Sequence, residues 1–514
     1  MNIATRLLNP DCYPHPVSTL KLVETHVSWV VLTGQFAYKI KKPLNLGFLD
    51  YSTLEKRHHC CEEELRLNRR LAQPLYLSVE PITETVNGVV RIKGHGAVVE
   101  YAVKMRQFAQ QDQFDELLAA AQLKPRHIFS LAKRLAQFHQ HAAVAPTASP
   151  WGNLEAVVEP MLENFQQLAQ LSQSQTDTTR LTTLQRRTQA EINNLKPLLN
   201  KRKTQGFVRE CHGDLHLRNI AMHDDALLIF DCIEFNDNLR WIDVMSELAF
   251  TVMDLYDRER ADLAMLLLNA YLEFSGDYQG VPLLRFYLVY RAMVRAKVAA
   301  IRARQTESPD VKTQAEQQAH HYIELAQQFY QKTRPALIIC HGLSGSGKTT
   351  YSESLVPLLQ ALRIRSDIER KRLAGLDALQ SSGSDGNRGI YSATMTQKTY
   401  RVLLELSDTL LKAGWPVIVD AAFLKWKERF EFRQLAAKLE VPFLILDFPT
   451  PTSLLNQRIM ERLAHGQDAS EATPAVLQQQ LQWQEPLDDT EKAASVNTLV
   501  TDAKQLSQTM RHSF

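Results

Sequence analysis

The 514-residue sequence contains little of what marks a membrane, secreted or polyanion-binding protein. It has no run of about 18 apolar residues, which a membrane-spanning helix needs. Its first six residues lack the apolar core of a signal sequence. Basic residues outnumber acidic ones by only 59 to 57, so bulk charge does not predict nucleic-acid binding. We therefore expect a cytoplasmic protein with no membrane partner and no obvious nucleic-acid partner, although a 5′-hydroxyl polynucleotide substrate stays possible.

Cysteine is also scarce, because six residues in the whole chain show no paired spacing typical of disulfide frameworks or zinc sites. The one cluster, residues 58–61 (His-His-Cys-Cys), is contiguous, and four successive helical residues point in four directions. They cannot converge on one tetrahedral ion. The length suggests about three domain-sized units, and the sequence leaves the oligomeric state open.

What the sequence does contain is a phosphate-binding loop. Residues 342–349 have the pattern Gly-x-x-x-x-Gly-Lys-Thr and follow the apolar run 336–340. Glycines in such a loop let backbone amides surround an anion at the start of a helix. Lys348 is expected to reach the β- and γ-phosphates, and the Thr349 hydroxyl to bind Mg²⁺. The residues predicted to bind ATP here are Gly342, Ser344, Gly345, Ser346, Gly347, Lys348, Thr349 and Thr350.

Strands and helices alternate after this loop, which predicts an α/β P-loop NTPase domain with a parallel sheet over residues 335–514. Asp367 follows the second strand, where a carboxylate can accept a proton from an attacking hydroxyl, and Arg370 can bind an anionic substrate. An ordinary helix N-cap is the alternative for Asp367. Asp420 ends an apolar strand and is the expected second Mg²⁺ ligand.

Arg458 and Arg462 lie four residues apart, on one face of a predicted helix. A lid carrying such arginines can close on a triphosphate and stabilise the transferring charge, so we assign both a catalytic role. A solvated basic face is the alternative. With its phosphate loop and these residues, the segment 335–490 resembles the small P-loop kinases grouped around gluconate kinase, zeta-toxin kinases and polynucleotide kinase.

The first half carries a different set of motifs. Residues 212–219 read His-Gly-Asp-x-x-x-x-Asn, and the apolar strand 227–231 ends in Asp231. Asp214 is expected to orient or deprotonate an acceptor hydroxyl, while Asn219 and Asp231 hold Mg²⁺. Alternating strands before residue 105 and helices after residue 124 predict an α+β bilobal kinase-like domain over 1–330. Its small lobe covers about 1–105 and its large helical lobe about 106–330.

This half resembles the aminoglycoside phosphotransferase family over about residues 30–300. The resemblance implies a strand lysine that grips the ATP phosphates and pairs with a helix glutamate. Lys39 fits the lysine, with Lys41 as the alternative, and Glu64 is the chosen partner, with Glu62 and Glu63 still possible. It also implies a hinge at residues 100–103 that binds adenine through its backbone. Asp243 is expected to order the catalytic loop.

Together the motifs predict a bifunctional ATP- and Mg²⁺-dependent phosphotransferase, with small-molecule hydroxyl acceptors for both domains. Two alternatives remain. In one, a single kinase domain is regulated by a nucleotide-sensing partner domain. In the other, the P-loop half is an ATPase that acts on a macromolecule.

Overall fold

The structure is a computed structural model that divides into two compact units. It describes residues 2–47, 49–171, 175–331, 334–378, 380–382, 389–465 and 470–513, without the side chains of 175, 462–465 and 511–513. The first unit comprises Met1–Lys124, His141–Glu163 and Ile192–Asp254. The second comprises Pro125–Gln140, Asn164–Glu191 and Leu255–Phe514. Each unit is described by itself below, and the domain boundary near residue 330 stays a prediction.

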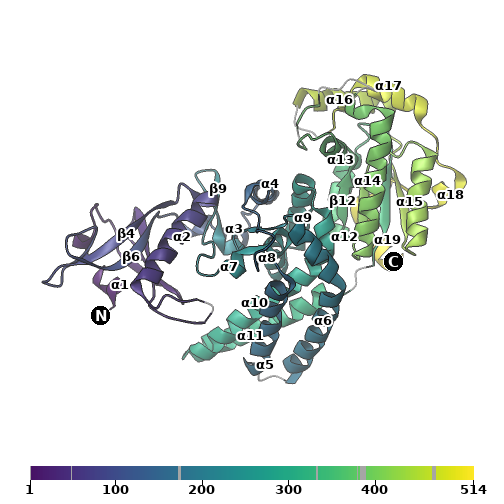
Figure 1. The fold of residues 1–514 in the computed structure, drawn as a ribbon. Helices are drawn as coiled ribbons and strands as arrows, with labels where there is room; N and C mark the ends of the chain where they lie inside the picture. The colour runs from purple at the N-terminus through teal and green to yellow at the C-terminus, as the bar shows by residue number, and fades with distance from the viewer. Residues whose placement is uncertain are drawn as a thin grey trace. The chain divides into compact units, whose positions relative to one another are not determined.

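The first unit contains a six-stranded antiparallel sheet in the order β1-β2-β3-β6-β4-β5 (Figure 1). Its strands are β1 Lys21–Glu24, β2 Ser28–Leu32, β3 Phe36–Lys41, β4 Tyr76–Glu84, β5 Val90–Ile92 and β6 Ala97–Arg106. Helix α2, Leu54–Ala72, packs against β4 and β6. The Thr53 hydroxyl accepts a hydrogen bond from the Lys56 amide and caps this helix at its start.

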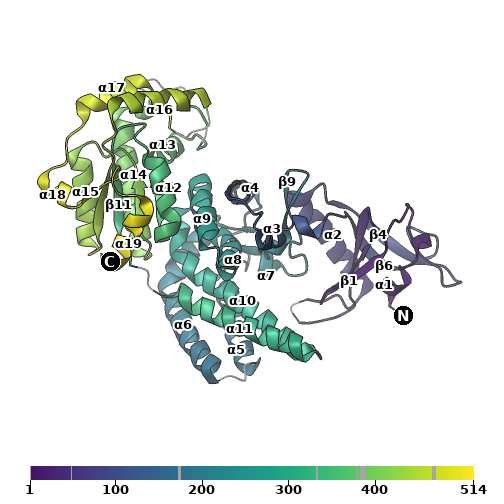
Figure 2. The same cartoon turned by 180° about the vertical axis from the view of Figure 1, so that it is seen from behind.

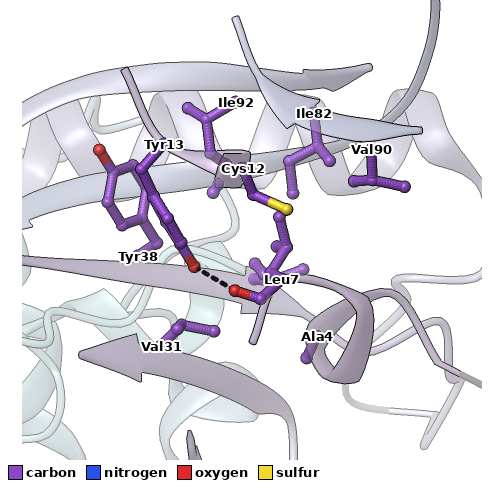
Figure 3. Packing of buried hydrophobic residues seen from close by; sticks show 11 residues of the cluster. Ala4, Leu7, Cys12, Tyr13, Val31, Tyr38, Ile82, Val90 and Ile92 are labelled. Carbon is purple, nitrogen blue, oxygen red and sulfur yellow. Dashed lines mark hydrogen bonds between the residues drawn. The ribbon is translucent and has the colours of Figure 1, made fainter. Parts of the chain in front are cut away.

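A cluster of buried apolar side chains joins the N-terminal segment to this sheet (Figure 3). Helix α1, Ile3–Arg6, contributes Ala4, and the residue that follows it, Leu7, is fully buried as well. The Tyr13 hydroxyl donates a hydrogen bond of 2.9 Å to the Leu7 carbonyl oxygen. The N-terminal segment is therefore an integral part of the small-lobe core.

The remaining elements of the first unit surround the His-Gly-Asp loop. Strands β7 and β10 pair antiparallel, as do β8 and β9. These elements are α3 Phe114–Ala119, β7 Val208–Glu210, β8 Ile220–His223, β9 Ala226–Ile229, α7 Asp237–Arg240, β10 Trp241–Asp243 and α8 Val244–Asp257. Helices α5, Leu154–Leu171, and α6, Gln175–Thr204, run through residue ranges of both units.

The second unit contains a five-stranded sheet in the order β12-β13-β11-β14-β15, with every neighbouring pair parallel. Its strands are β11 Leu337–His341, β12 Leu362–Arg365, β13 Val417–Asp420, β14 Phe443–Asp447 and β15 Ser495–Asn497. The core strands β11 and β13 are buried at every position, as expected for a sheet covered on both faces. The predicted parallel α/β fold is confirmed.

Twelve helices of the described residues belong to this unit. They are α4 Pro125–His141, α9 Ala261–Ser275, α10 Leu284–Gln305, α11 Pro309–Phe329, α12 Lys348–Leu359, α13 Ser366–Leu373, α14 Ala393–Lys412, α15 Trp426–Lys438, α16 Thr452–His465, α17 Pro474–Trp483, α18 Asp489–Ala493 and α19 Ala503–Ser513. Figure 2 shows α12, the helix after the phosphate loop, between α9 and α19, and α12 contacts both.

One strand boundary needs correction, and several strands were not predicted. Strand β4 is one of these, and Pro81 in its middle is atypical of a sheet interior. Residues 86–92 have the apolar pattern of a strand, yet β5 begins only at Val90, since residues 86–89 form a turn in which Gly88 has φ +77°. The three-residue β15 was missed as well. A polar loop at 383–388, considered as a substrate contact, lies outside the described residues.

Candidate active sites

The phosphate loop connects β11 to α12 in six residues. Gly345 has φ +82°, and a Cβ placed there would lie 2.9 Å from the Leu455 carbonyl oxygen. Both the backbone conformation and the close approach therefore require glycine. The Lys348 ammonium donates to the carbonyl oxygens of Gly342 at 3.0 Å and Leu343 at 2.7 Å. The lysine thus lies across its own loop, in reach of any anion that enters it.

A cavity of about 270 Å³ opens in front of this loop. The predicted ATP ligands Ser344, Gly345, Gly347, Lys348, Thr349 and Thr350 line it, while Gly342 and Ser346 are not among its lining residues. The same cavity is lined by Asp367, Arg370, Asp420 and Arg458. The fold therefore brings residues from four separate sequence segments to one place.

Asp420 and Thr349, the two predicted Mg²⁺ ligands, both line this cavity. The Asp420 Oδ2 atom is buried and accepts no hydrogen bond within the described part of the chain, and Arg365 Nε lies 3.8 Å from it. A buried carboxylate oxygen without a donor is costly, and oxygen ligands of this kind suit Mg²⁺. The two predicted metal ligands therefore fit the ion.

Asp367 lies in the first turn of α13, which begins at Ser366. Arg365 occupies the N-cap position there, and no side-chain cap is formed. The N-cap alternative for Asp367 is therefore not realised, and its side chain faces the cavity instead.

Arg370 is 7% exposed and already engaged by the protein. It donates to the Ile390 carbonyl oxygen at 3.2 Å and to the Thr396 hydroxyl at 2.9 Å. Its guanidinium lies 5.2 Å from the centre of the Tyr391 ring. One of its nitrogens, Nε, is buried and has no hydrogen-bond partner in the described chain. Arg370 is therefore a buried positive charge at the cavity wall, kept in place by these contacts.

The predicted lid arginines lie on α16. Arg458 donates a 3.4 Å hydrogen bond to the Gly345 carbonyl oxygen, so it reaches the phosphate loop directly. The side chain of Arg462 lies outside the described residues. Gln480 of α17 also reaches the loop, where its Oε1 accepts from the Ser344 amide at 2.9 Å. Sequence reasoning missed Gln480, since a single glutamine in a Gln-rich helix carries no signal.

In the first unit, Lys39 lies between two carboxylates. Its ammonium is 2.8 Å from Glu64 Oε1 and 2.5 Å from Asp231 Oδ1. Burial lowers the pKa of Lys39, but the two carboxylates more than offset this and hold it well above its usual range. The predicted Lys39–Glu64 ion pair is present. Glu62 and Glu63 instead contact His58 and Arg66.

Lys41 is not an alternative to Lys39 but an additional member of the same network. It is 1% exposed and lies 2.7 Å from Glu64 Oε2. Its ammonium also contacts Glu234, which accepts from the Tyr51 hydroxyl as well. Burial opposes ionisation of Glu64, yet the two lysines lower its pKa to about 2. Sequence reasoning placed both lysines on one strand face but did not include Glu234.

The His-Gly-Asp loop carries the predicted catalytic and metal-binding groups. Asn219 Nδ2 donates to the Asp214 carbonyl oxygen at 2.9 Å, which leaves its amide oxygen as a possible metal ligand. Asp231 follows β9 with φ +66°, and its side chain is 47% exposed. Asp214 is 39% exposed, with His216 Nε2 at 3.4 Å from its carboxylate. The two aspartates are therefore accessible to substrate.

Helix α8 orders this loop through residues that the sequence analysis missed. Glu247 accepts hydrogen bonds from the amides of His212 at 2.8 Å and Gly213 at 2.7 Å. The Thr251 hydroxyl donates to the Leu215 carbonyl oxygen, and the Asp254 carboxylate accepts from the Leu217 amide. These three polar residues are spaced i, i+4 and i+7 on an apolar helix, a signal that was available.

Asp243 does not bind the loop, contrary to expectation. Its carboxylate accepts two hydrogen bonds from Arg202, at 2.7 and 2.8 Å, in a buried ion pair. The hinge prediction is wrong too, because residues 100–103 lie inside β6 and pair with β4, and Ala102 and Val103 also pair with β3. Their backbone groups are engaged in the sheet, which β6 leaves only after Arg106.

Two family patterns match the chain. Residues 92–287 match the family described as phosphotransferase enzyme family, and residues 337–487 match an AAA domain. The first of these segments holds Asp214, Asn219 and Asp231 but not Lys39 or Glu64, and the second holds the residues of the phosphate-loop cavity. The chain is an ATP-dependent kinase. It carries one phosphotransferase-family domain and one P-loop kinase-like domain.

Relatives of similar length exist. Uncharacterized proteins of Mycobacterium tuberculosis and Mycobacterium bovis are 28% identical over 476 residues, which is 92% of this kinase and 93% of each relative. The similarity therefore extends over most of both chains. No helix in the described residues is both long and apolar enough to cross a membrane.

Solved structures resemble each half separately. A Cryptosporidium parvum choline kinase covers 63% of this chain and 95% of its own, with 11% identity and a TM-score of 0.38. A Sinorhizobium meliloti gluconokinase covers 34% of this chain and 90% of its own, with 19% identity and a TM-score of 0.24. At these scores the likenesses say nothing about the substrates of this kinase.

Proposed function

We propose that the chain is a bifunctional phosphotransferase in which each domain transfers the γ-phosphoryl group of ATP to a hydroxyl of a small molecule. One observation carries the proposal. Each half contains its own lysine for the triphosphate, its own pair of metal ligands and its own carboxylate for the acceptor. A regulatory or purely structural domain would need only part of such a set.

In the second half, Lys348 and the loop amides would hold the β- and γ-phosphates, with Thr349 and Asp420 holding Mg²⁺. Mg²⁺, when bound, offsets charge on the triphosphate. Asp367 would orient the acceptor hydroxyl and take its proton as the oxygen–phosphorus bond forms and ADP departs. Arg458, which already reaches the loop, would stabilise negative charge on the transferring group.

The first half would divide the same work among different residues. Lys39, aligned by Glu64, would bind the phosphates, and Asn219 and Asp231 would hold Mg²⁺. Asp214 has a side chain that is 39% exposed and lies in the same loop as Asn219, so it would orient or deprotonate the acceptor. Glu247 would keep the loop in place by binding its backbone amides.

The cavity charge supports an anionic acceptor in the second half. Lys348, Arg365, Arg370 and Arg458 line the cavity, against the carboxylates Asp367 and Asp420. A planar guanidinium with an unused buried donor, as in Arg370, suits a carboxylate or phosphate group. A small acid with a hydroxyl group is therefore the substrate class that we assign to this site.

The test compares Asp214→Asn and Lys348→Met in the full chain. Purified protein is incubated with ATP, Mg²⁺ and a metabolite extract, and phosphorylated products are identified by mass spectrometry. A panel of sugars, amino alcohols, hydroxy acids and 5′-hydroxyl oligonucleotides is assayed in parallel. We expect each variant to lose one product by about 100-fold or more while the other product is retained.

Other outcomes identify the alternatives. Loss of the same single product in both variants would indicate one catalytic domain with a nucleotide-sensing partner. ATP hydrolysis that rises with a macromolecule, without any phosphorylated product, would contradict the proposal and favour an ATPase. An oligonucleotide product would change the acceptor class but not the reaction.

A further inference from the structure

Helix α9 covers the edge strand of the P-loop sheet and is bonded to it directly. Asn269 Oδ1 accepts from the Arg363 amide at 2.7 Å, and its Nδ2 donates to the Ala361 carbonyl oxygen at 3.1 Å. One amide side chain thus takes the place of a neighbouring strand beside β12, whose edge would otherwise be open to pairing. This attachment fixes the position of the rest of α9 relative to β12.

Glu273 lies one turn further along α9, beside β12, and it contacts two arginines of that strand. Its Oε1 accepts from Arg363 at 3.0 Å, and its Oε2 lies 3.6 Å from Arg365 Nη1. Glu273 is 7% exposed, so the pairs are little screened by water. The last turn of α9 is held as well, because Arg372 donates to the Glu273 carbonyl oxygen at 2.9 Å.

Arg365 therefore stands between two carboxylates of different predicted function. On one side is Glu273, and on the other is Asp420, whose Oδ2 lies 3.8 Å from Arg365 Nε. Both distances are too long for a hydrogen bond between Arg365 and the carboxylate. A guanidinium prefers two-point bonding to a single carboxylate, so loss of Glu273 would remove one of the contacts that hold Arg365 and would favour its approach to Asp420. The oxygen that fits Mg²⁺ would then be occupied.

We propose that Glu273 is a positioning residue for the P-loop active site, because it holds Arg365 away from Asp420 and keeps Asp420 available to Mg²⁺. Glu273 lies in the stretch that matches the phosphotransferase family, whereas Arg365 and Asp420 lie in the stretch that matches the AAA domain. One family segment thus completes the metal site of the other. This inference rests on the proposed kinase function of the P-loop half.

The test measures metal-dependent nucleotide binding in the full chain carrying Lys39→Met, which silences the first site. This parent keeps Glu64 paired with Lys41, so we expect it to fold. Calorimetric titrations with the ATP analogue AMP-PNP are run over a Mg²⁺ series and in EDTA. We expect Glu273→Gln to raise the Mg²⁺ concentration needed for half-maximal binding about 5-fold. Binding in EDTA should not change.

Two further variants identify the route of the effect. Asp262→Asn is the matched control, since Asp262 lies on the same helix but pairs with Arg260 at the surface. It should leave the Mg²⁺ requirement unchanged. Arg365→Met removes a positive neighbour of Asp420, so it should lower that requirement, and adding Glu273→Gln to it should have no further effect. This variant also tests the inference if Glu273→Gln alone does not fold.

If Glu273→Gln and Asp262→Asn have the same Mg²⁺ requirement, this inference is wrong, while the proposed function is not affected. A shift that persists in the Arg365→Met background would also contradict the inference, because the effect would then not pass through Arg365. If the Lys39→Met parent takes up no nucleotide at any Mg²⁺ concentration, the proposed function fails and the inference falls with it. Thermal unfolding of each variant without Mg²⁺ separates lost stability from lost metal binding.

Discussion

Lys39 and Lys348 have the same predicted role in the two halves of the chain, yet the protein holds them by different means. Lys39 is fixed by the carboxylates of Glu64 and Asp231, within a buried ionic network that includes Lys41. Lys348 instead lies on carbonyl oxygens of its own loop. The first site depends on side-chain charges from distant segments, and the second on a local backbone conformation. We therefore expect the first site to be sensitive to removal of a charge and the second site to be sensitive to a change in the backbone of the loop.

The largest expected effect is the loss of stability in Lys41→Met. This change removes a buried cation between Glu64 and Glu234, and breaking such a pair costs about 3–5 kcal/mol. We expect the urea midpoint of the first unit, followed by tryptophan fluorescence, to fall accordingly. Lys42→Met is the control, because Lys42 pairs with the exposed Glu24 and should cost about 1 kcal/mol or less. Equal losses in both variants would contradict the network.

The backbone-dependent site should respond to Gly345→Ala. The added Cβ would meet the Leu455 carbonyl oxygen, so the loop must shift, and we expect AMP-PNP affinity at this site to fall about 10-fold or more. Gly414→Ala is matched, since its φ of +83° carries the same strain but nothing lies within 4 Å of the new atom. Both variants should lose about 1–2 kcal/mol of stability. If both variants bind AMP-PNP equally, the close contact between Gly345 and the Leu455 carbonyl oxygen does not matter for nucleotide binding.

The smallest effect is a pH dependence in the catalytic loop of the first unit. Burial lowers the pKa of His212, whose Nε2 lies 2.8 Å from the Phe230 carbonyl oxygen. Around pH 6.5 the unfolded chain therefore binds more protons at this residue than the folded one. The free energy of unfolding should thus fall as the pH drops below about 6.5, by at most about 1.4 kcal/mol per unit.

Urea titrations between pH 7.5 and 5.5 measure this slope. His212→Gln should remove the contribution, so its slope over this range should be shallower than that of the wild type. Parallel slopes for the wild type and His212→Gln would mean that His212 binds protons equally in the folded and unfolded states, which would contradict the prediction.

The sequence predicted best those parts of the molecule in which a short segment fixes its own geometry. The phosphate loop and the strand ending at Asp420 follow from local spacing, whereas the ion pair of Lys39 with Glu64 was implied by the family resemblance. The hinge at residues 100–103 was misplaced because pairing with β3 and β4 is a property of distant segments. The roles of Glu247 and Glu273 were missed because each binds a segment far from it in sequence. The spacing of Glu247, Thr251 and Asp254 marks a polar face on α8, but it does not identify the loop that this face binds.

The contact of Asn269 with β12 also bears on how the chain is made. Residues 261–275 leave the ribosome before residues 362–365, so the amide that receives the strand is already synthesised when the strand emerges. An open edge strand promotes aggregation chiefly while a nascent chain is incomplete, because the edge can then pair with another copy. Helix α9 can therefore cover the edge of β12 as soon as that strand is synthesised, and this would limit aggregation during translation.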